Sequence, residues 1–96
     1  MTKDIKDIEL KFSKKTVKGD PMCWLELSDK TTIEIAYEEG YDGDRFYSVV
    51  HFCTKEDFEA GLYGDAGIID LFGCDTLEEV RKVLQYPSMI GDAEVI

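Results

Sequence analysis

Residue types on which many catalytic and metal sites depend are scarce in this chain of 96 residues. There is one histidine, His51, and there are three cysteines, Cys23, Cys53 and Cys74. The cysteine count is odd, the spacings are wide and no CxxC pair occurs, which argues against a disulfide framework. We therefore expect free thiols in a reducing compartment.

Long apolar runs and phosphate-binding motifs are also missing. The opening residues contain no apolar segment of the signal-peptide kind, and no run approaches the roughly 20 apolar residues that span a bilayer. The glycines at 61, 64, 67 and 73 fit neither GxGxxG nor GxxxxGK[ST]. We expect one domain over residues 1–96 in the cytoplasm, or the host cytoplasm if a phage encodes it, without a cofactor, metal ion or membrane contact.

Basic residues are few, and they are unevenly placed. Eleven lysines and arginines face 21 acids, which gives a net charge of −10. Residues 1–19 carry six lysines and three acids (+3), whereas residues 54–79 carry eight acids and Lys55 alone (−7). Residues 38–44 add four acids and no base. Such a chain repels nucleic acid and anionic membranes and attracts basic partners, although solubility alone is a simpler explanation.

The residues that are present predict an α+β fold. Alternating apolar and polar residues predict strands over 8–13, 22–27, 32–37 and 45–53, and the last is apolar on both faces, as in the middle of a sheet. Thr54 and Thr76 are expected helix N-caps. Residues 62–74 fit a packed loop or a brief strand, and the tail could add an edge strand. We predict an antiparallel sheet of four strands, or five, and two short helices on one face, in β-β-β-β-α-α order.

Charge, size and the absence of a catalytic motif favour a non-enzymatic protein-binding domain. Its acidic second half would dock on a basic protein surface. In the narrower form of this prediction, the protein is a phage or mobile-element inhibitor of the anti-CRISPR or anti-restriction type, and it blocks the basic nucleic-acid-binding groove of a defence enzyme. No motif supports that narrower assignment. The residues expected to contact the partner are Glu38, Glu39, Tyr41, Asp42, Asp44, Glu56, Asp57, Glu59, Asp65 and Asp70.

Two alternatives remain open. One is a housekeeping or immunity-type interaction module whose partner has no relation to nucleic acid. The other is a small Cys/His metal or thiol protein, because His51 and Cys53 are two residues apart and share one face of a predicted strand. Cysteines, however, are among the most often buried residues. The sequence is compatible with a monomer or a homodimer, since Met22 or Trp24 on an exposed sheet face would allow pairing.

Overall fold

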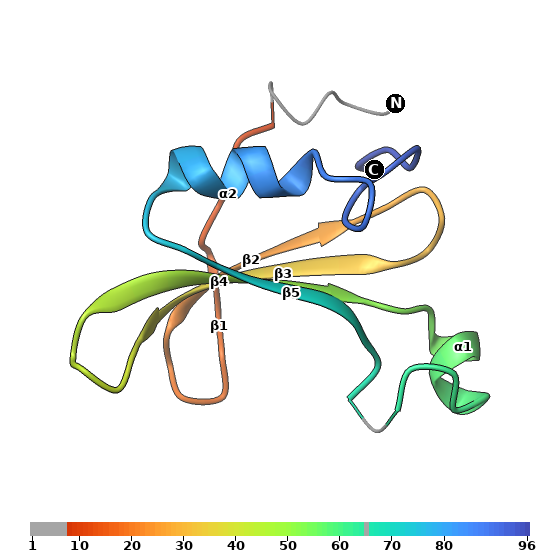
Figure 1. Ribbon diagram of the computed structural model, residues 1–96, viewed down its shortest axis with the longest axis horizontal. Coiled ribbons are helices and arrows are strands. Elements are labelled where there is room, and N and C mark those ends of the chain that lie inside the picture. Colours follow the sequence, from red (N-terminus) through yellow and green to blue (C-terminus); the bar gives the residue numbers. More distant parts are fainter. Residues whose placement is uncertain (1–7, 65) are drawn as a thin grey trace.

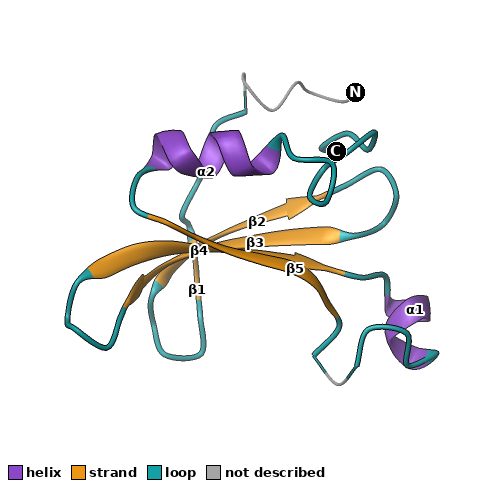
Figure 2. Ribbon diagram, viewed as in Figure 1, coloured by secondary structure: helices purple, strands orange, loops and turns teal. Residues whose placement is uncertain are grey.

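The computed structural model describes residues 8–64 and 66–96. Five strands and two helices follow one another as β1 (Lys14–Lys15), β2 (Pro21–Glu26), β3 (Thr32–Glu39), β4 (Arg45–Phe52), α1 (Lys55–Glu59), β5 (Ile68–Cys74) and α2 (Leu77–Leu84). Each strand is antiparallel to its sequence neighbour, so the sheet is a meander in the order β1-β2-β3-β4-β5 (Figures 1 and 2). The prediction of an antiparallel sheet with two short helices is confirmed.

The strand register defines two faces of the sheet. One row across β2 to β5 consists of Cys23, Ile35, Val49 and Phe72. The next row consists of Trp24, Glu34, Val50 and Leu71. Because successive side chains of a strand point to opposite faces, these two rows lie on opposite sides of the sheet.

Helix α2 covers the face that carries Cys23, Ile35 and Val49, which we call the covered face (Figure 1). Val80, Val83 and Leu84 are the buried residues of α2, and they join the strand residues in a single core cluster. At its start, the Thr76 hydroxyl accepts a hydrogen bond from the Glu79 backbone amide at 3.2 Å, as the N-cap prediction requires. The core thus lies on one side of the sheet.

The strand predicted over residues 8–13 is wrong. Only Lys14–Lys15 pair with β2, and residues 8–13 leave the sheet. Ile8 is buried in the core cluster, against which Leu10 and Phe12 also pack, and the Arg81 guanidinium donates to the Ile8 carbonyl at 2.9 Å. The apolar alternation of residues 8–13 therefore reflects packing along the core. A period of two indicates which side chains are buried, but it does not indicate whether the segment pairs with a strand.

The element order also differs from the prediction, because β5 stands between the two helices. Residues 62–74 contain three glycines and an apolar run, so the sequence fitted either a packed loop or a brief strand. Pairing with β4 makes the second half of this segment a strand, β5. The tail contributes only an isolated bridge between Leu27 and Val95. As predicted, β4 lies inside the sheet, with neighbours on both sides.

Helix α1 does not form a layer with α2. Its N-cap is as predicted, with the Thr54 hydroxyl accepting from the Asp57 amide at 3.1 Å, but none of its residues is buried. Figure 1 shows α1 beyond the end of β4, displaced from α2 toward the opposite side of the sheet. Among the described residues, no helix has the length and apolar character that crossing a membrane requires.

Candidate partner-binding surface

The sheet face opposite α2, which we call the open face, has no helix over it (Figure 1). By register it carries apolar side chains from β2, β4 and β5, among them Trp24, Val50, Phe52, Ile68 and Leu71. Trp24 is 40% exposed and Leu71 is 56% exposed, whereas Ile35 and Val49 on the covered face are 0% exposed. Large apolar residues that gather on a solvent-exposed face are typical of an interaction surface.

Three segments project beyond the sheet on the side of the open face (Figure 1). They are the β1–β2 connection, the β3–β4 connection, and α1 with the turn after it. Val17 and Tyr41 are fully exposed on the two connections, and Leu62 is 67% exposed after α1. Each projection thus presents a large side chain to solvent, and together they surround the open face.

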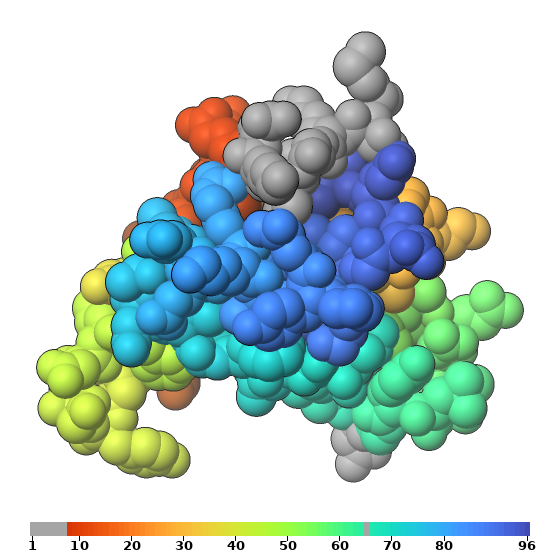
Figure 3. Space-filling view, turned by 45° about the horizontal axis from the view of Figure 1, so that its top comes forward, coloured from red at the N-terminus to blue at the C-terminus, as the bar shows by residue number. Residues whose placement is uncertain are grey.

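The acidic residues predicted to contact a partner lie in two groups. Glu38, Glu39, Asp42 and Asp44 lie at the β3–β4 hairpin tip with Tyr41, and Glu56, Asp57 and Glu59 lie on α1. The register pairs Thr32 with Phe52 at the α1 end and Glu39 with Arg45 at the tip end. Eight residues of strand span roughly 23 Å, and Figure 3 shows the tip and α1 as separate projections. The structure does not bring these residues into one continuous cluster.

The last two predicted contact residues do not join either group. Asp65 lies outside the described residues. Asp70 pairs by register with His51, which places its side chain on the side of the covered face, and its Oδ1 accepts the Leu71 amide at 2.8 Å. The Asp70 side chain thereby satisfies the Leu71 backbone amide, which belongs to an edge strand, β5.

Glu34 lies in the middle of the open face, between Trp24 on β2 and Val50 on β4. It is half-buried, and this burial raises the pKa of the Glu34 carboxyl above its ordinary value, with a smaller contribution from the negative charge of Glu38. Within the described part of the chain, no hydrogen bond or ion pair engages its carboxylate. A carboxylate in this position gains from any cation that reaches it.

The lysines near the start of the chain do not neutralise these acids by direct pairing. In residues 8–64 and 66–96, the ion pairs join Lys11 to Glu9, Arg45 to Asp20 and Lys55 to Glu59. Lys15 and Lys18 line a hollow of about 360 Å³ together with Glu34 and Glu38, without forming an ion pair. The hairpin tip therefore keeps its carboxylates available to a partner.

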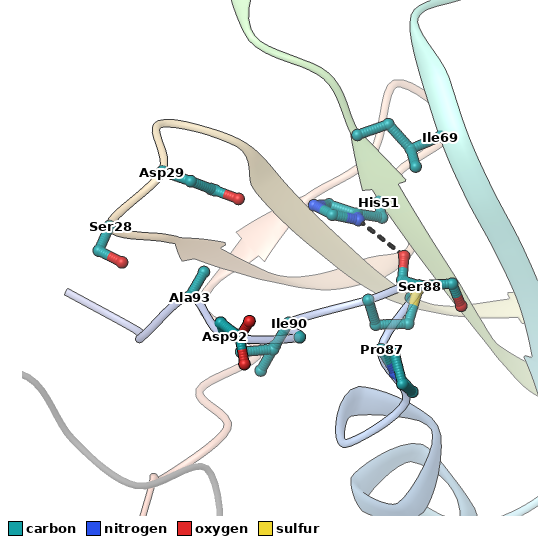
Figure 4. Close-up of a pocket in the computed structure, with 11 residues that line it drawn as sticks. Ser28, Asp29, His51, Ile69, Pro87, Ser88, Ile90, Asp92 and Ala93 are labelled. Atoms are coloured by element: carbon teal, nitrogen blue, oxygen red, sulfur yellow. Dashed lines mark hydrogen bonds between the residues drawn. The ribbon is translucent and has the colours of Figure 1, made fainter.

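His51 has a structural position on the covered face. Its Nδ1 donates to the Ser88 carbonyl at 3.1 Å, and its Nε2 lies 2.8 Å from the Thr31 hydroxyl, which itself donates to Asp29 Oδ1 at 2.6 Å. The ring thus connects the β2–β3 turn to the segment after α2. Figure 4 shows it at the edge of a shallow hollow of about 560 Å³ that this segment borders.

The cysteines are all free thiols. Burial raises the pKa of the Cys23 thiol, and it also raises the pKa of the Cys74 thiol, to which Glu79 and Asp75 add. Both thiols are therefore less easily ionised than an exposed cysteine. The described residues contain no group of three or more His, Cys, Asp or Glu side chains arranged to hold a metal ion.

The open face contains residues that were not among the predicted partner contacts, above all Trp24, Glu34, Val50 and Leu71. Two signals pointed to them. Residues 45–53 are apolar on both sides, and the alternation of β2 places Trp24 with Met22 and Glu26 on the face away from Cys23. Both were compatible with burial under a helix, so only the position of α2 identifies this face as open.

Comparisons with protein-family models, with curated proteins and with solved structures find no match for this chain.

Proposed function

We propose that this protein is a non-enzymatic protein-binding domain that docks the open face and its acidic ends on a basic partner surface. The observation that carries the proposal is the position of Trp24 and Leu71, large and exposed, on a face between two acidic projections. Apolar side chains at the centre with charged groups around them are the usual organisation of a protein interface. The charges would direct encounter with a basic partner, and the apolar face would supply affinity.

The distribution of charge restricts the partner further. Acids lie at both ends of the open face, while Lys14, Lys15 and Lys18 lie along its β1 side. A matching surface is apolar at its centre and basic opposite the hairpin tip and opposite α1. Enzymes that bind nucleic acid present basic surfaces, so the narrower form of the proposal is an inhibitor that occupies the nucleic-acid-binding groove of such an enzyme. The narrower form requires that nucleic acid and this protein compete for the partner.

Charge reversal at each acidic end tests the proposal. The protein serves as bait for capture from its native cells, and the dissociation constant of each captured protein is measured at two salt concentrations. One variant combines Glu39→Lys with Asp44→Lys at the tip, and another combines Glu56→Lys with Glu59→Lys on α1. We expect each to weaken binding, and we expect affinity to fall as salt rises.

A matched control reverses two acids on the other side of the sheet. Glu9→Lys combined with Glu94→Lys changes the net charge equally, at two exposed residues in segments on the α2 side. This control should leave the dissociation constant close to that of the wild type. A partner that binds all variants equally, or that loses affinity equally with the control, would refute the proposed function.

A further inference from the structure

Trp24 and Glu34 form a cross-strand pair at the centre of the open face. They are direct partners in the β2–β3 register, so their Cβ atoms lie roughly 4.5–5.5 Å apart on the same face. Trp24 is 40% exposed and is the only tryptophan of the chain. An indole surface and a carboxylate are thus presented side by side to any molecule that covers this face.

This pair lacks a cation. Glu34 is half-buried between its cross-strand partners Trp24 and Val50, and the described residues supply neither a hydrogen bond nor an ion pair to its carboxylate. Lys15 and Lys18 border the same hollow but stay outside ion-pair distance. A guanidinium combines a flat surface that stacks on an indole with donors that match a carboxylate.

The same combination occurs within this molecule between its own residues. The Arg45 guanidinium carbon lies 4.7 Å from the centroid of the Tyr37 ring, and its Nη2 lies 3.4 Å from Asp20 Oδ1. An aromatic ring on β3 and a carboxylate in the β1–β2 connection therefore hold an arginine in this fold. Trp24 and Glu34 present a similar ring and acid with no arginine between them.

We propose that the Trp24–Glu34 pair is the site where an arginine of a partner protein binds, with its guanidinium stacked on the indole and paired with the carboxylate. This inference rests on the proposed function and names the side chain that the open face recognises. A partner protein is favoured over a second copy of this chain. Each copy carries a net charge of −10, and self-docking would place Glu26, Glu34 and Glu38 against the same open-face carboxylates.

Trp24 fluorescence provides the test, because no other tryptophan contributes. The probe is a blocked pentapeptide, Leu-Arg-Leu-Arg-Leu, titrated to millimolar concentration against the full chain. The comparison peptide contains citrulline, a neutral analogue of arginine, at both arginine positions. We expect the arginine peptide to change the fluorescence of Trp24 saturably, and the citrulline peptide to bind at least about tenfold more weakly.

Glu34→Gln keeps the shape of the side chain and removes its charge. This variant should bind the arginine peptide about tenfold more weakly than the wild type, whereas the matched control Glu94→Gln on the α2 side should bind it unchanged. Circular dichroism confirms that both variants are folded. Trp24→Leu, followed by amide chemical shifts of β2, should also weaken binding because stacking on the indole is lost.

Equal binding of the two peptides, or wild-type affinity in Glu34→Gln, would overturn this inference. It would leave the proposed function intact if the tip and α1 variants still lose their captured partner. Sedimentation of the free protein adds a further outcome. A dimer in which Trp24 becomes inaccessible to a fluorescence quencher would show that a second copy occupies the open face, and it would overturn the assignment to arginine.

Discussion

Truncation of Ile35 to alanine should destabilise the protein far more than truncation of Leu71 to alanine. Both residues lie within strands of the same sheet, but they occupy opposite faces. Ile35 is 0% exposed and packs in the core under α2, whereas Leu71 is 56% exposed on the open face. The comparison therefore measures which face of the sheet contains the core.

The expected magnitudes follow from burial. Removing a fully buried isoleucine side chain costs about 2–5 kcal/mol, since a cavity remains in the core. Burying a leucine side chain fully contributes about 1.5–3 kcal/mol to stability. Because Leu71 is 56% exposed, less than half of its side chain is buried, and its truncation should cost about 1 kcal/mol. For a chain of this size, these losses correspond to falls in Tm of about 10–25 °C for Ile35→Ala and about 5 °C for Leu71→Ala.

Urea unfolding of the two variants, followed by far-UV circular dichroism, measures both losses. The slope of the unfolding free energy against urea should stay the same in both variants, so that the midpoints alone report stability. Comparable losses above about 2 kcal/mol for both variants would refute the reasoning, because Leu71 would then have to be packed as tightly as Ile35.

Three further predictions concern the β5 edge, Glu34 and the thiols. Asp70→Ala frees the Leu71 amide on the outer edge of β5, and we expect concentration-dependent association on size-exclusion chromatography; a strictly monomeric variant would contradict this. Burial raises the pKa of the Glu34 carboxyl, so folding favours its protonated form and its contribution to stability decreases as pH rises from the ordinary glutamate value through the raised one. Glu34→Gln should thus raise the urea midpoint at neutral pH, and the gain should vanish at pH values below the ordinary pKa; a loss at neutral pH would contradict the sign. Burial raises the pKa of both the Cys23 and Cys74 thiols, so they should react with a disulfide reagent only after urea is added, and rapid reaction of either in the native protein would show that it is accessible.

The stability prediction for Glu34 also bears on binding. A carboxylate that lowers the stability of the free protein is consistent with a role in the complex, where a cation would offset its burial. The variant Glu34→Gln should therefore be more stable at neutral pH and bind arginine more weakly. Opposite signs for stability and affinity separate a recognition role from a structural one.

Local sequence determined several elements of this protein without tertiary information. Alternation over β2 and β3 specified the strands and their buried faces, because a period of two distinguishes the two sides of a sheet. Thr54 and Thr76 specified the helix starts, because a side-chain oxygen satisfies a backbone amide only a few residues away. Both signals depend on interactions between residues that are close in the chain.

Tertiary structure decided which apolar face is covered, which strands exist at the margins and which charges meet. Residues 8–13 have the alternation of a strand but lack a strand partner, whereas residues 68–74, rich in glycine and apolar side chains, become β5 through pairing with β4. The acids grouped in sequence separate to the two ends of the sheet, because the hairpin tip and α1 are connected to opposite ends of β4. Side-chain pattern describes what a segment can bury, but its partner is chosen by contacts between residues far apart in the chain.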